Sequence, residues 1–231
     1  MISTLSIIIP VLNEAGIIVS ALSRLQSLRA AGHEIIVVDG GSNDGTPVLS
    51  EPLANRVISS PRGRAHQMNA GAEITSGGIL LFLHADTLLP ENADRLIFSG
   101  MARTGKKWGR FDISLSGKHF LFPIIASLMN LRSRITSIAT ADQAIFVERR
   151  LFLFVQGFPE IDLMEDIALS KILKRTGKPL CLWHRVLTSS RRWEKNGILR
   201  TVLQMWFQRL AYFLGVDPRH LARCYNEMKE R

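Results

Sequence analysis

The chain is poor in cysteine and has no long uninterrupted apolar run, and each absence excludes a class of protein. Its 231 residues hold two cysteines, Cys181 and Cys224, at a spacing that matches no metal-binding pattern. Isolated cysteines favour a reducing compartment. Charge or proline breaks the apolar runs well short of the roughly 18–20 residues of a membrane span, and no basic-then-apolar leader begins the chain. We therefore expect a cytoplasmic protein without a membrane span.

The signatures of nucleic-acid and phosphate-loop proteins are also missing, although the chain is basic. The formal net charge is +9, from 29 basic and 20 acidic residues. Such an excess attracts phosphates on nucleic acid, anionic lipid or nucleotides. No helix-turn-helix spacing, zinc-finger pattern or RNP-like aromatic run accompanies the charge, so we expect no nucleic-acid partner. The phosphate-loop pattern Gly-x-x-x-x-Gly-Lys is absent as well.

What is present predicts a single α/β domain over residues 1–231. No linker, charge block or repeat divides the chain, and 46% of its residues are hydrophobic. Leu5–Ile9 is a buried strand that we expect Pro10 to end. Helical apolar spacing follows Asn13, and Glu34–Val38 is a second strand. Strand, helix and strand of these lengths predict a right-handed crossover in a mixed, mainly parallel sheet flanked by helices.

Polar residues follow both of these strands and leave the same end of the sheet. In open α/β sheets, ligands bind in the crevice at the carboxyl ends of the strands. Asp39 follows the second strand and suits hydrogen bonds from a base or a ribose hydroxyl. The alternative is an Asx-turn that closes a surface loop. Glu14 follows the first strand and lines the same crevice, or it is an ordinary acid that complements a helix dipole.

Three further side chains point to a diphosphate and a metal ion. Arg64 lies at a helix start, where a cation opposes the dipole, so an anion such as a diphosphate, or a structural carboxylate, explains it better. The apolar run Gly78–Thr87 predicts a strand that ends in His84 and Asp86, on the same side of the chain. Asp86 fits Mg²⁺ or Mn²⁺ bridging a diphosphate; the alternative is a helix cap or a loop acid.

The second half of the chain leaves more alternatives open. Glu165 and Asp166 begin a helix, either as ordinary caps or with one carboxylate as a general base. We expect Phe120–Ala126 to be core, although it is apolar enough for an acceptor-side surface or a membrane contact. The long helix Ile198–Leu214 has Arg200, Gln204 and Gln208 on a polar face. We expect its apolar face to pack on the sheet, with a membrane surface as the alternative.

Taken in order, four motifs resemble those of the family 2 glycosyltransferases, which have the Rossmann-like GT-A fold. The chain looks most like the short bacterial members that lack membrane spans. The match runs from residue 5 or so to residue 90 or so, and looser matches at Glu165-Asp166 and Arg191-Arg192-Trp193 extend it. The four motifs are Ile8-Ile9-Pro10-Val11-Leu12-Asn13-Glu14, Asp39-Gly40-Gly41-Ser42-Asn43-Asp44-Gly45-Thr46, Arg64-x-x-Gln67-x-Asn69-x-Gly71 and His84-Ala85-Asp86.

The resemblance implies a role for each matching position. Residues 1–90 would bind the nucleotide-sugar, and residues 91–231 would form the acceptor side. Asp166 would be the base that deprotonates an acceptor hydroxyl, with inversion at the anomeric carbon. The donor would contact Pro10, Asn13, Glu14, Asp39, Arg64, Asn69 and Asp86. The acceptor side would hold Glu165, Arg191, Arg192 and Trp193.

Two positions depart from the family pattern. His84 replaces the first acid of the Asp-x-Asp motif, so the divalent metal would either be held by Asp86 with phosphates and a second residue such as His184, or bind weakly. Ser189 stands where the glutamine of the C-terminal motif would be, which puts the acceptor contacts in doubt.

The resemblance thus predicts a metal-assisted hexosyltransferase that uses a UDP- or GDP-linked donor. The acceptor is open, and the apolar stretches allow a lipid-linked acceptor and a peripheral membrane contact without requiring either. One rival is a nucleotidyltransferase on a related sheet, whose Gly-rich, Lys-containing N-terminal loop is missing here. The other is a non-catalytic module that binds nucleotides or anionic surfaces through the basic second half.

Overall fold

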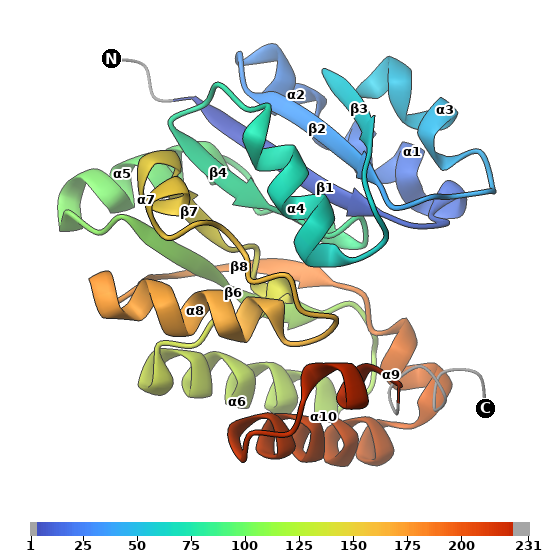
Figure 1. Ribbon diagram of the computed structural model, residues 1–231, viewed down its shortest axis with the longest axis vertical. Helices are drawn as coiled ribbons and strands as arrows, with labels where there is room; N and C mark the ends of the chain where they lie inside the picture. The colour runs from blue at the N-terminus through green and yellow to red at the C-terminus, as the bar shows by residue number, and fades with distance from the viewer. Residues whose placement is uncertain (1–3, 224–231) are drawn as a thin grey trace.

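The computed structural model describes residues 4–223, except for the side chain of Arg192. Within them, eight strands form one sheet in the order β3-β2-β1-β4-β7-β6-β8-β5 (Figure 1). The strands are β1 (Leu5–Val11), β2 (Glu34–Asp39), β3 (Arg56–Ser59), β4 (Ile79–Phe82), β5 (Thr87–Leu88), β6 (Trp108–Leu115), β7 (Phe146–Glu148) and β8 (Leu180–Thr188). The helices are α1 (Ala15–Ser23), α2 (Gln26–Ala30), α3 (Thr46–Ser50), α4 (Arg64–Glu73), α5 (Ala93–Thr104), α6 (Leu121–Thr136), α7 (Arg149–Phe154), α8 (Glu165–Thr176), α9 (Arg191–Asn196) and α10 (Ile198–Phe213), with 3-10 turns η1 (Glu51–Leu53) and η2 (Ala141–Gln143).

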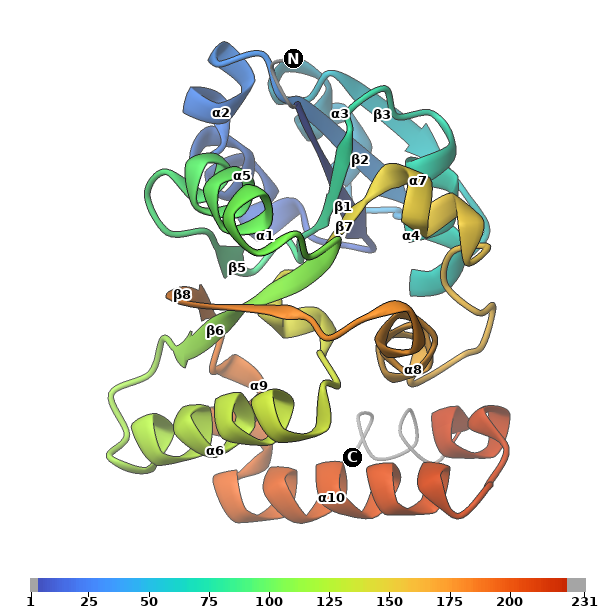
Figure 2. The same ribbon diagram turned by 90° about the vertical axis from the view of Figure 1, so that its left-hand side faces the viewer.

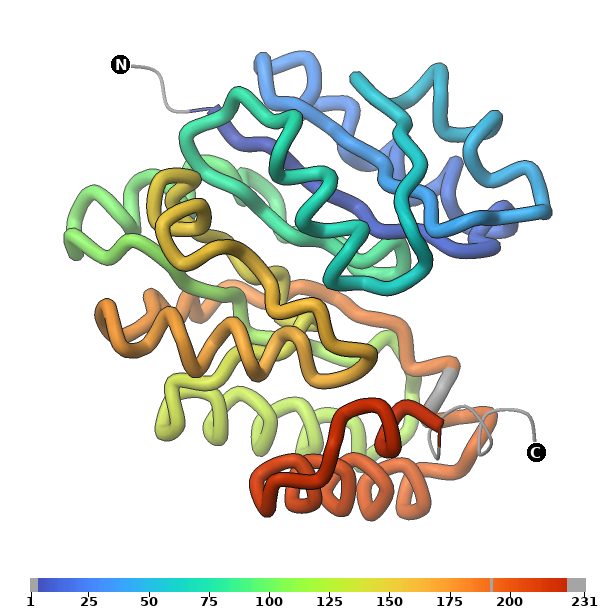
Figure 3. Tube along the Cα trace, viewed as in Figure 1, coloured from blue at the N-terminus to red at the C-terminus, as the bar shows by residue number. Residues whose placement is uncertain are grey.

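The predicted α/β class is confirmed, with a mixed and mainly parallel sheet. β1 pairs in parallel with β2 and β4, and β2 pairs in parallel with β3. The unit β1–α1–β2 is therefore the crossover that the spacing predicts. β7 runs antiparallel to both β4 and β6, whereas β6 and β8 are parallel. The chain passes from the N-terminal part of this sheet to the C-terminal helices at the lower end of the molecule (Figure 3).

Alternating side chains of β1 divide the core into two layers. Ile7 and Ile9 belong to the cluster that includes α1 and α5, whereas Ile8 belongs to the cluster that includes α4, α7 and α8. Figure 2 shows these two groups of helices on opposite sides of the sheet. α4 approaches β1 closely because it has Gly71 at the contact, where an added Cβ would lie 2.5 Å from the Ile8 side chain.

The expectation that Pro10 ends the first strand is wrong, because β1 continues to Val11. Ile8 gives its carbonyl to Leu83 on the β4 side, and Val11 gives its carbonyl to Gly40 on the β2 side. Pro10 lies two residues after Ile8, so its backbone faces the same neighbouring strand. The N–H that proline lacks would therefore have pointed toward β4. The pairing with β4 already ends at Ile8 and Phe82. The proline therefore costs no ladder hydrogen bond.

The strand predicted over Gly78–Thr87 is also shorter than expected. β4 ends at Phe82, and a turn follows in which the Thr87 N–H donates to the His84 carbonyl at 3.0 Å. Thr87 then begins β5, which pairs antiparallel with β8 at the far edge of the sheet. The apolar residues between β4 and β5 stay buried in the same core. These apolar residues are therefore buried without forming one continuous strand.

The apolar face of α10 does not pack on the sheet as predicted. Leu203, Trp206 and Phe207 are 70%, 69% and 69% exposed, whereas Gln208 on the other side of the helix is buried. The run Phe120–Ala126 is only partly core, because Phe122 and Ala126 are buried whereas Phe120 and Ile124 are exposed. Within the described residues, none of the helices is both long and apolar enough to cross a membrane.

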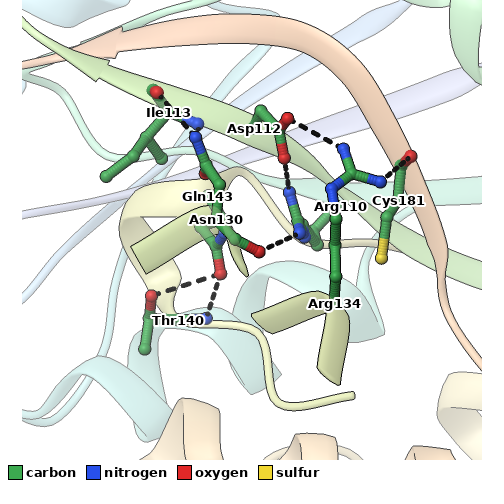
Figure 4. Close-up of polar contacts among 8 residues, drawn as sticks. All are labelled: Arg110, Asp112, Ile113, Asn130, Arg134, Thr140, Gln143 and Cys181. Carbon is green, nitrogen blue, oxygen red and sulfur yellow. Dashed lines mark hydrogen bonds and ion pairs between the residues drawn. The ribbon is translucent and has the colours of Figure 1, made fainter. Parts of the chain in front are cut away.

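A buried ion cluster joins β6 to α6 (Figure 4). Arg110 is fully buried and donates to the Asp112 carboxylate and, at 3.1 Å, to the Asn130 carbonyl. Asp112 also accepts a hydrogen bond from Arg134 Nη2 at 2.8 Å. The Arg134 guanidinium lies over the Trp183 ring, 3.5 Å from its centroid. The buried Arg110 needs a counter-charge, which Asp112 supplies. Because Asp112 on β6 also binds Arg134 on α6, it helps to fix how α6 lies on the sheet.

Replacing this carboxylate should destabilise the fold. We expect Asp112→Ala to lower the free energy of unfolding by about 3–5 kcal/mol, because Arg110 would remain buried without its counter-charge. Chemical denaturation measures the change. The matched control is Asp162→Ala, an exposed aspartate, which should shift the free energy by no more than about 0.5 kcal/mol. Equal stability of Asp112→Ala and the wild type would contradict a structural role for the cluster.

Candidate active site

Hydrogen bonds join the loop after β1 to the loop after β2. The Asn13 N–H donates to Ser42 Oγ at 2.8 Å, and the Asn43 N–H donates to Asn13 Oδ1 at 3.0 Å. The Ala15 N–H donates to Asp44 Oδ2 at 2.9 Å. Asn13 has a φ of 55°, in the left-handed region that asparagine tolerates better than most residues. These residue types therefore hold two strand-end loops as one surface.

Gln67 on α4 supports the two joined loops through hydrogen bonds. Its side chain is buried on α4, and Nε2 donates to the carbonyls of Val11 and Val38, both at 2.8 Å. An added Cβ at Gly40 would lie 3.1 Å from the Gln67 amide. Because Gly40 has no Cβ, the Gln67 amide can lie against the chain at this point.

Asp39 forms the Asx-turn that the sequence left open as an alternative. Its Oδ2 accepts hydrogen bonds from the N–H groups of Gly41 and Ser42, both at 2.9 Å, and its Oδ1 accepts from Ser42 Oγ. A carboxylate has about four acceptor positions, so these three bonds leave capacity for another donor. The turn and a contact to a base or ribose are compatible.

Two adjoining cavities lie at the carboxyl ends of the strands. The first, which we call the carboxylate cavity, has a volume of about 240 Å³, and the second, the strand-end cavity, about 340 Å³. Both are lined by Arg64, His84, Asp86, Leu163 and Glu165. The carboxylate cavity is also lined by Asp142, Asp166, Ser189, Trp193, Gln208 and Arg209. The strand-end cavity is also lined by Pro10, Glu14 and Gln67.

Glu165 and Asp166 begin α8 at the wall of the carboxylate cavity. Asp166 accepts hydrogen bonds from the N–H groups of Ala141 at 2.9 Å and of Ile167 at 2.7 Å, while burial raises its pKa. Glu165 is buried, and its Oε1 lies 3.9 Å from Arg64 Nη1. Burial, and then the Asp166 charge, raise the pKa of Glu165 to about 7. Both carboxylates are therefore better proton acceptors than an exposed acid.

His84 and Asp86 face the same cavities, brought there by the turn after β4. Burial raises the pKa of Asp86, although the residue is open to solvent on one side. Burial, and then the charge of Arg64, lower the pKa of His84 to about 3. Its Nε2 is buried without a hydrogen-bond partner among residues 4–223. The sequence prediction that these two side chains share a site agrees with their positions.

The C-terminal motif contributes to the same region. Trp193 is buried and lines the carboxylate cavity beside Ser189. Arg191 is exposed and lines a third hollow that also reaches Asp86. The side chain of Arg192 lies outside the described part of the chain.

Two predicted site residues are found elsewhere. His184 is exposed, in the irregular part of β8 where the register with β6 shifts, and lines none of the three hollows that contain Asp86. Asn69 uses its whole amide on the backbone of Phe158: Nδ2 donates to the carbonyl and Oδ1 accepts from the N–H, both at 2.9 Å. Asn69 therefore anchors the loop before α8.

Asp142, Gln208 and Arg209 also line the carboxylate cavity, although no sequence motif predicts a role for them there. Buried atoms of two of them, Asp142 Oδ1 and Gln208 Nε2, have no hydrogen-bond partner within the described chain. The spacing of Gln204 and Gln208 on α10 was the available signal. Both belong to the predicted polar face, of which Gln208 points inward and is buried, whereas Arg200 is exposed.

The backbone has the GT-A fold, as comparisons with solved structures show. It is similar to TarS from S. aureus, solved with UDP-GlcNAc, with a TM-score of 0.66 and 17% sequence identity over 80% of this chain and 58% of that one. It is also similar to the mannosyltransferase PcManGT from Pyrobaculum calidifontis, solved with GDP-Man and Mn²⁺, with a TM-score of 0.61 and 20% identity over 80% of this chain and 56% of that one.

The chain belongs to glycosyl transferase family 2. The sequence model of that family matches residues 6–140, more than half of the chain. A PGL/p-HBAD biosynthesis glycosyltransferase from Mycobacterium bovis is 37% identical over 98 residues, which are 39% of this chain and 38% of that protein. The match thus spans well under half of the curated relative. The family named from the four motifs is confirmed.

The raised pKa of Glu165 predicts a pH-dependent stability. The pKa is about 7 in the folded chain against an ordinary value of 4.5, so the folded protein binds this proton more tightly than the unfolded chain. Stability should therefore fall as the pH rises from about 4.5 to about 7, and level off above that. We expect Glu165→Gln to lose this part of the fall, and its stability relative to the wild type to be higher at pH 8 than at pH 4 by up to about 3 kcal/mol.

Chemical denaturation at several pH values measures this difference. The matched control is Glu73→Gln, an exposed glutamate on α4, which should follow the wild type at every pH. Parallel stability curves for Glu165→Gln and the wild type would contradict the raised pKa.

Proposed function

We propose that the protein is an inverting glycosyltransferase that moves a hexose from a nucleotide-diphosphate donor, UDP- or GDP-linked, to an acceptor hydroxyl. The observation that carries the proposal is the pair of adjoining cavities. One opens between strand-end loops of the kind that bind nucleotides, and the other holds buried carboxylates on α8. Arg64 and Asp86 line both cavities, where a diphosphate between base and sugar would lie.

The residues at the shared wall fit a divalent metal completed by substrate. Asp86 offers a carboxylate, and Mg²⁺ or Mn²⁺ commonly takes one or two carboxylates together with phosphate oxygens and water. Among residues 4–223 there is no cluster of three or more His, Cys, Asp or Glu side chains that could hold a metal by itself. Asp86 would hold the ion with the diphosphate, and the ion would neutralise charge that develops on the leaving group. Arg64 would add its own positive charge to the same oxygens.

Asp166 is the base that we propose for the acceptor. Its carboxylate is oriented by the N–H groups of Ala141 and Ile167 and faces the carboxylate cavity. It would take the proton of the acceptor hydroxyl as the new bond to the anomeric carbon forms and the bond to the diphosphate breaks. Glu165 lies beside Arg64 and lines both cavities, so we propose that it positions Arg64.

Donor binding should depend on Asp86 and on metal. In thermal unfolding with UDP- and GDP-linked sugars and Mn²⁺, a donor at about 100 times its dissociation constant should stabilise the protein by about 2.7 kcal/mol. Chelator or Asp86→Ala should weaken donor binding about tenfold or more. His184→Ala is the control, because His184 is outside the cavities, and should bind as the wild type does. A donor shift unaffected by both chelator and Asp86→Ala would overturn the metal site.

Turnover should depend on Asp166 more than on Glu165. We expect Asp166→Asn to lower kcat by about 10²–10⁴-fold with little change in donor affinity, because the amide cannot accept the proton. Glu165→Gln keeps the base and should retain more activity. Donor hydrolysis in the absence of acceptor provides an assay that needs no acceptor. Unchanged turnover in Asp166→Asn would contradict its role, and donor binding without any turnover would favour the non-catalytic module.

A further inference from the structure

Large apolar side chains are exposed on both α6 and α10, the helices at one end of the molecule (Figure 1). The two helices lie side by side and run in the same direction in both views (Figures 1 and 2). Their N-terminal ends border one open hollow, lined by Phe120 and Leu121 on one side and by Ile198 and Leu199 on the other. We call the outward sides of these helices the end surface.

On α6 the end surface is a stripe with helical spacing. Ile124, Leu128, Leu131 and Ile135 are each more than half exposed, at intervals of four, three and four residues. Phe122, Ala126 and Met129 on the opposite side are buried in the core. The exposed stripe therefore points away from the sheet.

On α10 the stripe is longer and contains aromatic residues. The outward residues are Leu199, Leu203, Trp206, Phe207, Leu210 and Phe213, all at least 58% exposed. Thr201, Gln208 and Ala211 form the buried side. Ile198, Val202 and Met205 also pack against the core, so α10 is apolar on its outward side as well as on part of its inward side, unlike an ordinary surface helix. So many large apolar side chains in one area exceed the scattered exposure of a soluble surface.

Exposed basic residues border the end surface. α6 and α10 contain four arginines and no acidic residue, and of these arginines Arg200 is exposed. Lys118, Lys195 and Arg200 are exposed beside the apolar stripes. An apolar helix face with basic residues and a tryptophan is typical of helices that lie in the interface of an anionic membrane. In a two-fold dimer through the same surface, the basic rims would face each other.

We propose that the end surface docks the protein on an anionic lipid bilayer. α6 and α10 lie parallel to the membrane plane, with Trp206 and Phe207 in the interface and Arg200 among the headgroups. The inward side of α10 carries Gln208 and Arg209, which line the carboxylate cavity. One helix therefore separates the bilayer from that cavity, so docking brings the cavity to the level of the headgroups. This inference does not depend on the proposed reaction.

Vesicle flotation of the full chain tests the docking. The vesicles are phosphatidylcholine alone, or phosphatidylcholine with about one third phosphatidylglycerol. We expect the wild type to float with the anionic vesicles, and Trp206→Ser with Phe207→Ser to lower the partition coefficient at least about tenfold. Arg200→Glu should weaken binding to the anionic vesicles only, as should raised salt. The matched control is Phe154→Ser, an 80% exposed aromatic on α7, which should float as the wild type does.

Two further measurements keep the proposal falsifiable if the double variant folds poorly. Lipids with brominated acyl chains should quench tryptophan fluorescence of the wild type, and Trp206→Phe, which keeps the surface apolar, should lose part of that quenching. Sedimentation gives the oligomeric state. Absence of flotation, flotation unchanged by the double variant, or a dimer that the double variant dissociates would each overturn membrane docking, and the last result would assign the surface to a second copy of the chain.

Discussion

The site depends on a single buried amide at the point where β1 and β2 separate. Where two parallel strands separate into loops, side-chain donors can add hydrogen bonds to their last carbonyls, beside ladder bonds such as the one from the Gly40 N–H to the Val11 carbonyl. Gln67 supplies one to Val11 and one to Val38, at 2.8 Å each. The loops beyond are then joined by Asn13, Ser42 and their neighbours. Without this junction, the two polar loops would be separate surface turns rather than one wall of a cavity.

The carboxylate cavity is lined by both acidic and basic side chains, whose charges have opposite effects on the acids. Asp86, Asp142, Glu165 and Asp166 all line it, together with Arg64 and Arg209. Burial and neighbouring acids raise the pKa of Asp86, Glu165 and Asp166, and the arginines act in the opposite direction. Nearby, Arg132 has its pKa lowered to about 10 by burial and by the charge of Arg209. A site arranged in this way holds carboxylates that accept protons readily, yet it keeps positive charge close to where a diphosphate would leave.

The first half of the fold could be predicted from the sequence because its signals are local. Buried strands, helical spacing and polar strand ends of residues 5–90 each lie within a few residues of one another. Other features depended on distant partners. The turn that Asp39 forms leaves open whether its carboxylate also contacts a ligand. Asn69 hydrogen-bonds to the backbone of Phe158, 89 residues away. The orientation of α10 could not be predicted, because a hydrophobic pattern identifies two faces of a helix and not which face a cavity will occupy.

The pairing of β5 with β8 has a consequence for how the chain folds. It joins Thr87 to Thr188, 101 residues apart, and the β6–β8 pairing is similarly remote. The β1–β2 and β2–β3 pairings instead join residues 28 and 20 apart, such as Ser6 with Glu34 and Ile36 with Arg56. These shorter loops cost less chain entropy and form sooner. We infer that the loops after β1 and β2 can order while residues 140–210 are still unstructured. The enclosure around Asp166 would then be completed late, and a chain interrupted during synthesis would have the joined strand-end loops without either complete cavity, because Leu163 and Glu165 line both.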